Sequence, residues 1–117
     1  MRFQLAARGV MRTSIGTALV AAGLVFAAPA HADVDTDFNN ELHLYGIYAG
    51  KDYNAWIAKI SCKRINNGLD NDANKAATFV HRNLAKDATT EQAYQFLGAA
   101  LRSYCPDKMS ILEQAAQ

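Results

Sequence analysis

The chain has 117 residues, of which half are hydrophobic and a fifth charged, and its formal net charge is +1. This length allows one small domain besides any targeting segment and excludes a multidomain enzyme. A charge so close to zero does not favour binding to nucleic acid or to an anionic membrane surface.

Residues 1–32 are typical of a secretory signal peptide. Three arginines precede a long uncharged apolar run, which closes with the small-residue pattern Ala30-His31-Ala32. The alternative is a membrane-spanning helix, but the run is at the short edge of the roughly 20 residues that a span needs, and a proline interrupts its end. We expect cleavage between Ala32 and Asp33, and a secreted product with no stable membrane span.

Residues 33–117 then form a single helical domain of 85 residues. It carries nine Lys and Arg against eleven Asp and Glu, a net charge near −2. A domain of this size buries a modest share of its surface, so we expect a thin stability margin that a covalent link would improve.

The first predicted helix lies within residues 33–46, with Asp35 or Thr36 as its cap and Gly46 at its end. Its apolar face consists of Phe38, Leu42 and Tyr45.

The second predicted helix, in residues 51–68, begins with Asp52 as cap and ends at Gly68. It is apolar on two faces, and such a helix generally lies in the middle of a domain. One face contains Tyr53, Trp56, Ile57 and Ile60, and the other contains Ala55, Ala58, Cys62 and Ile65.

Two further helices follow, in residues 70–87 and 89–105. Asp70 or Asp72 caps the former, and Thr89 and Gln92 have capping-box spacing at the start of the latter. Pro106 ends that helix or begins a short terminal one. The inward faces contain Ala73, Ala76, Ala77, Val80 and Leu84, then Ala93, Phe96, Leu97, Ala100, Leu101 and Tyr104. The predicted fold is therefore all-α, a small bundle of four helices plus a short C-terminal helix.

Cys62 and Cys105 are the two cysteines, and both lie on inward-facing apolar rows. In a small exported domain, an even number of cysteines indicates a disulfide. Its closed loop of about 44 residues would stabilise the fold by roughly 4 kcal/mol. The alternative is a reactive thiol at Cys62 activated by Lys63 and Arg64, but these two side chains occupy other faces of the helix.

Residues 70–75 resemble the start of a calcium loop, but Lys75 and His81 stand where an EF-hand needs glycine and glutamate. His43 and His81 lie beside the apolar stripes, which favours surface positions over haem or metal ligands. No motif for hydrolytic catalysis is present. We expect no catalytic residue, no metal site and no cofactor.

A ligand groove is the second use that the aromatic residues allow, although aromatic side chains at helical spacing more often belong to the core. The residues that such a groove would use are Trp56, Tyr53, Tyr48, His43 and His81.

The ordered set of Phe38, Leu42, Gly46-Ile47, Cys62, Gly68 and Tyr104-Cys105-Pro106 resembles a family of small exported mycobacterial proteins known as domain of unknown function 732. The resemblance covers nearly all of residues 33–117. It implies a compact α-helical domain with its two cysteines paired, and it implies no activity.

Our leading hypothesis is a non-enzymatic exported domain that binds an unknown partner in the cell envelope or outside the cell. The alternative is a small-ligand carrier, for haem or a lipid, that uses Trp56, the tyrosines and His43 or His81. A third class, a thiol-dependent enzyme, would require free cysteines.

Overall fold

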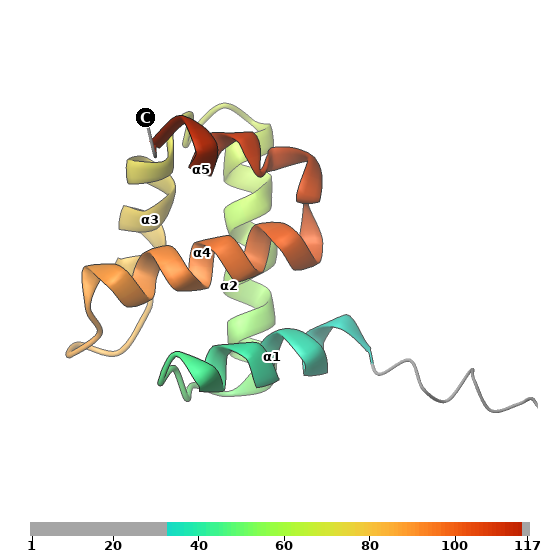
Figure 1. Cartoon of the computed structure of the whole chain (residues 1–117), viewed down its shortest axis with the longest axis vertical. Coiled ribbons are helices and arrows are strands. Elements are labelled where there is room, and N and C mark those ends of the chain that lie inside the picture. The colour runs from blue at the N-terminus through green and yellow to red at the C-terminus, as the bar shows by residue number, and fades with distance from the viewer. Residues whose placement is uncertain (1–32, 116–117) are drawn as a thin grey trace, which may run out of the picture. The chain divides into compact units, whose positions relative to one another are not determined.

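A computed structural model describes residues 33–115, which form a helical domain (Figure 1). The predicted signal peptide, residues 1–32, lies outside the described part, as do residues 116 and 117. No helix within residues 33–115 is long and apolar enough to cross a membrane.

All regular elements in the described part are helical, so the predicted all-α fold is confirmed. They are α1 (Val34–Leu44), α2 (Lys51–Asn66), α3 (Ala73–Arg82), α4 (Thr90–Tyr104), the 3-10 helix η3 (Pro106–Lys108) and α5 (Ser110–Ala115).

The first two helix starts differ from the prediction. Asp33 caps α1, because its Oδ1 accepts a hydrogen bond of 2.9 Å from the Thr36 backbone N–H. Asp35 and Thr36, which the sequence favoured as caps, lie inside the first turn. Helix α2 begins after Gly50 with no side-chain cap, so the prediction of Asp52 as cap is wrong.

The next two helix starts agree with the sequence. Asp72, one of the two predicted caps, accepts from the Lys75 backbone N–H at 2.8 Å. Thr89 and Gln92 form a complete capping box, in which each side chain accepts a hydrogen bond from the backbone N–H of the other. This arrangement satisfies two of the N–H groups that a helix start leaves free.

Gly46 and Gly68 end α1 and α2, as predicted, with φ angles of +79° and +77°. After α1, the N–H of Gly46 bonds to the His43 carbonyl and the N–H of Ile47 bonds to the Leu42 carbonyl. These two bonds form a Schellman motif, which requires a left-handed residue at the glycine position.

Helix α4 is the most buried element. It lies across α2 and beside α1, which runs in the opposite direction in the view of Figure 1. Phe96 and its successors through Leu101 are all buried, whereas α2 keeps one face in solvent. The centre of the domain is therefore α4 packed on α2, not α2 alone as the two-faced pattern indicated.

Phe38 of α1 packs at the centre of the aromatic core. Its ring meets the rings of Phe96 and Tyr104 edge to face, each at a centroid distance of 5.3 Å. This geometry suits the quadrupoles of the rings and anchors α1 on α4.

The predicted disulfide is present. Cys62 of α2 bonds to Cys105 at the C-terminal end of α4, with Cα atoms 6.1 Å apart and both residues buried. Beside it, the Tyr104 hydroxyl donates to Asp35 Oδ1 at 2.5 Å, and Lys59 Nζ lies 3.5 Å from Asp35 Oδ2. One end of α1 is thereby tied to both helices that the disulfide joins.

Candidate functional site

An open cleft of about 580 Å³ lies between two loops of the described part of the chain. The first loop, residues 45–50, connects α1 to α2, and the second, residues 83–89, connects α3 to α4. We call this hollow the interloop cleft. Its lining residues are Leu44, Tyr45, Gly46, Ile47, Tyr48, Ala49, Leu84, Ala85, Asp87, Ala88, Thr89, Glu91, Gln92 and Gln95.

Gln92 holds the two sides of the cleft together. Its Oε1 accepts from the Thr89 backbone N–H, and its Nε2 donates to the Tyr45 carbonyl at 2.9 Å. One side chain therefore caps α4 and braces the first loop against it.

Gly46 lets the first loop come close to Gln92. A Cβ atom at position 46 would lie 3.4 Å from Gln92 Nε2, and the φ of +79° is unfavourable for any other residue type. The positive φ at the end of α1 therefore favours glycine here, and a Cβ atom would touch the side chain that braces the loop.

Asn54 fixes the far end of the same loop from inside the protein. This fully buried side chain donates through Nδ2 to the Ala49 carbonyl and to Asn39 Oδ1, both at 3.1 Å. The Nδ2 of Asn39 in turn lies 3.4 Å from Nε2 of His43. The cleft is therefore built on a fixed backbone, as binding sites usually are.

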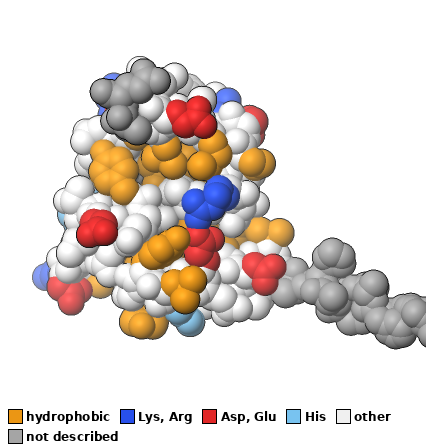
Figure 2. Space-filling model, in the orientation of Figure 1, with side chains coloured by type: hydrophobic (Ala, Val, Ile, Leu, Met, Phe, Trp, Pro, Cys, Tyr) orange, Lys and Arg blue, Asp and Glu red, His pale blue; other side chains and the backbone are white. Residues whose placement is uncertain are grey.

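The cleft has an apolar part formed mainly by the first loop. Ile47 is buried and Leu84 half-buried, whereas Leu44 is 81 % exposed and Tyr48 is 72 % exposed. Large apolar side chains this exposed generally mark a binding surface when they lie together beside a hollow. Orange side chains lie along the lower edge of the domain in Figure 2.

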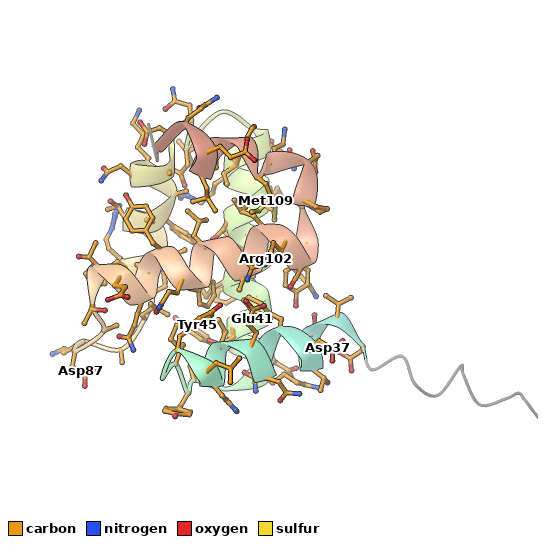
Figure 3. The ribbon with its side chains drawn as sticks, in the orientation of Figure 1. Asp37, Glu41, Tyr45, Asp87, Arg102 and Met109 are labelled. Atoms are coloured by element: carbon orange, nitrogen blue, oxygen red, sulfur yellow. A yellow bond between two sulfur atoms is a disulfide. The ribbon has the colours of Figure 1, made fainter. Side chains whose placement is uncertain are left out.

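The charged part of the cleft comes from the second loop and the first turn of α4. Asp87 and Glu91, both exposed, are its two ionised side chains, and no Lys, Arg or His lines it. Figure 3 shows Asp87 at the outer tip of the second loop, on the side of the domain where α4 begins. The arrangement offers carboxylate acceptors next to apolar surface.

The structure places the five predicted groove residues in three locations. Tyr48 lines the interloop cleft, and the His43 ring lies 5.2 Å from the Tyr48 ring in a tilted arrangement. His81 lies behind the second loop, where its Nε2 donates to the Ala88 carbonyl at 2.8 Å. The prediction that both histidines lie at the surface or its boundary is confirmed, since His43 is exposed and His81 half-buried.

Tyr53 and Trp56 form a separate exposed pair on α2, with ring centroids 6.1 Å apart. Trp56 is 58 % exposed, and the Tyr53 hydroxyl donates to the Asn83 carbonyl at 2.8 Å. The preference for a core role is therefore wrong for these two residues, as it is for Tyr48. Helical periodicity placed them on a common face with Ile57, but of these three side chains only that of Ile57 is buried.

The segment that resembled a calcium loop has structural roles. Asp72 caps α3, and Asp70 is buried and forms a two-bond ion pair with Arg64, at 2.7 and 3.2 Å. Within residues 33–115, no three His, Cys, Asp or Glu side chains are grouped closely enough to hold a metal ion.

Sequence reasoning missed the cleft as a site, except for Tyr48. Its two loops are brought together by a contact between residues 47 positions apart, Gln92 and Tyr45. The available signal was the pair of Gly46 and Gln92, each of which was interpreted only as a helix boundary.

Comparison with known proteins gives a consistent result. The model of a family described as "Protein of unknown function (DUF732)" matches residues 34–107. Two proteins from Mycobacterium tuberculosis, the uncharacterized protein MT0585 of strain CDC 1551 and the uncharacterized protein Rv0559c of strain H37Rv, are each 49 % identical over 105 residues. The alignments cover 89 % of this chain and 94 % of each relative. No solved structure matches.

Proposed function

This chain belongs to the DUF732 family of proteins of unknown function, and we propose that it is a non-enzymatic exported module that binds its partner through the interloop cleft. The family resemblance drawn from Phe38, the Cys62–Gly68 segment and Tyr104-Cys105-Pro106 is thereby confirmed. The partner belongs to the cell envelope or to the medium outside the cell.

The observation that carries the proposal is the fixed backbone of the cleft beneath exposed apolar side chains. Gln92 and Asn54 hold the first loop at both ends, while Leu44 and Tyr48 stay in solvent. When a ligand binds to a preformed hollow, little free energy is lost in ordering the loops of the protein. The role as a binder, not an enzyme, is supported by the two sulfur atoms, which are bonded to each other and leave no thiol nucleophile.

Export is supported by the sequence of residues 1–32 and by the disulfide. Disulfides persist in oxidising compartments and are rare in the cytosol. Asp33, the residue after the predicted cleavage point, caps α1, so a chain that begins there keeps its first helix intact.

A haem carrier is the second candidate, because His43 and Tyr48 lie together beside the cleft. Histidine and tyrosine are both known haem ligands. The carboxylates of Asp87 and Glu91 argue against it, since they would repel the propionates of haem. The lipid version has less support, because the cleft is open to solvent. A haem titration in which the protein leaves the Soret band of free haem unshifted excludes the haem version.

Native mass spectrometry of the protein from the culture medium of a mycobacterial host tests the proposal. We expect residues 33–117, an intact disulfide and a bound ligand. Ala85→Trp, which fills the cleft from an exposed lining position, should abolish the bound species, whereas Asn66→Trp, on an exposed position outside the cleft, should retain it.

Three outcomes contradict the proposal. Retention of the full-length chain in the cells refutes export. A bound species that survives Ala85→Trp refutes the cleft as the binding site. Chemical conversion of the bound species by the purified protein refutes the non-enzymatic role.

A further inference from the structure

We propose that the ligand of the interloop cleft is an organic cation, an amine or guanidinium group carried on a compact apolar body. This inference rests on the proposed function and adds the chemical class of what is bound.

The charge of the cleft is the first argument. Asp87 and Glu91 supply two negative charges, and the lining contains no positive side chain to neutralise them. Lys86 adjoins Asp87 in the sequence but does not line the cleft. A cation that enters therefore gains attraction from both carboxylates.

The start of α4 disfavours anions, the main competing ligand class. A helix N-terminus generally attracts anions through its free N–H groups. Here the N–H of Gln92 already bonds to Thr89 Oγ1 at 3.0 Å, and the N–H of Thr89 bonds to the Gln92 side chain. The capping box thus occupies two of the donors at this helix start, and the carboxylate of Glu91 in the same turn repels a phosphate or carboxylate ligand.

The lining of the cleft has a charged part and an apolar part, so a matching ligand has one charged end and one apolar end. The carboxylates come from the second loop and α4, whereas the exposed apolar residues are Leu44, at the end of α1, and Tyr48, in the first loop. A Tyr ring also attracts a cation over its face. The ligand that fits both halves has a charged head and an apolar body, and about 580 Å³ suits a small molecule.

Three probes with the same phenyl body and different charges test this inference: 2-phenylethylamine, 2-phenylethanol and 3-phenylpropionate. Each is titrated into ¹⁵N-labelled protein expressed from the full chain with its disulfide formed, and backbone amide shifts are followed by NMR. We expect the amine to shift amides of residues 44–49 and 84–92 and to bind about tenfold more tightly than the alcohol at low salt, since each exposed carboxylate contributes about threefold. The acid should bind most weakly.

Charge-neutralising variants identify the source of the preference. Asp87→Asn with Glu91→Gln should reduce the ratio between amine and alcohol to about one, because both changes preserve shape and remove the two charges. Asp37→Asn is the matched control, because Asp37 is an exposed carboxylate on α1 outside the cleft, and it should leave the ratio unchanged. Raising the salt concentration should lower the ratio in the unmodified protein.

The inference is overturned if the alcohol or the acid binds as tightly as the amine, if the ratio survives the double substitution, or if the amine shifts only amides near Tyr53 and Trp56. These failures leave the proposed function standing, since the mass-spectrometric test with Ala85→Trp does not depend on the charge of the ligand. Loss of the bound species in Asn66→Trp as well would instead count against the proposed function.

Discussion

Replacing either cysteine by alanine should destabilise the domain by about the whole contribution of the cross-link. The Cys62–Cys105 bond has a sequence separation of 43, so it closes a loop of about 44 residues. In the chain-entropy relation this loop restricts the unfolded ensemble by about 13 cal/mol/K, or about 4 kcal/mol at 25 °C. For a domain of this size the melting temperature should fall by roughly 20 °C.

Thermal unfolding followed by far-ultraviolet circular dichroism measures this loss. Each single variant is studied with reductant present, because its remaining thiol can pair between molecules. Cys62→Ala and Cys105→Ala should each lose about 4 kcal/mol, and the double variant should lose little more than either, since one bond is removed in all three cases. The unmodified protein with its disulfide reduced should match the double variant to within about 1 kcal/mol. Additive losses in the double variant would refute the reasoning.

Two other predictions concern a loop and a hydroxyl. Gly46→Ala should lower the free energy of unfolding by about 1–2 kcal/mol in chemical denaturation and shift the NMR signals of the amides around Gln92. The control is Gly68→Ala, which has a similar positive φ but open space around it, so it should cost about 1 kcal/mol without that shift. An equal shift of the amides around Gln92 in both variants would contradict the bracing role of Gln92. Burial and the hydrogen bond to Asp35 raise the pKa of Tyr104 above its ordinary value of 10.0. The neutral hydroxyl therefore stabilises the fold fully below about pH 10, and this contribution disappears as the pH rises above that value. The stability advantage of the unmodified protein over Tyr104→Phe should stay constant from pH 8 to about pH 10 and shrink from pH 10 to pH 11. A difference that stays constant up to pH 11 would refute this linkage.

The helix boundaries show how much local sequence determines. Thr89 and Gln92 form the predicted capping box, and Gly46 and Gly68 end their helices, because each of these depends on a few neighbouring residues. The cap of α1 was placed two or three residues too late, since several polar residues compete there and only backbone geometry selects Asp33. The disulfide was predictable because two cysteines allow one intramolecular pairing.

The partner of each helix face was less predictable. Small residues of α2, among them Asn54 and Ser61, are fully buried, whereas Trp56 remains in solvent. Hydrophobicity alone would place Asn54 and Ser61 in solvent and Trp56 in the core. The small side chains lie where other helices pack closely, and periodicity says which residues share a face without saying which face is covered.

The cleft could not be predicted from periodicity at all. It depends on two loops far apart in the sequence, and its lining mixes polar, small and apolar residues without a repeating pattern. Tyr48 was identified as a groove residue on its aromatic character, but the contact between Gln92 and the Tyr45 carbonyl required the folded chain.

The double role of Gln92 distinguishes residues that hold the frame of the cleft from residues that only form its rim. A substitution at Gln92 disturbs the start of α4 and the first loop together. Asp87 and Leu44 are exposed side chains whose replacement leaves the frame untouched. Substitutions at these rim positions therefore change the surface chemistry of the cleft while the scaffold stays the same.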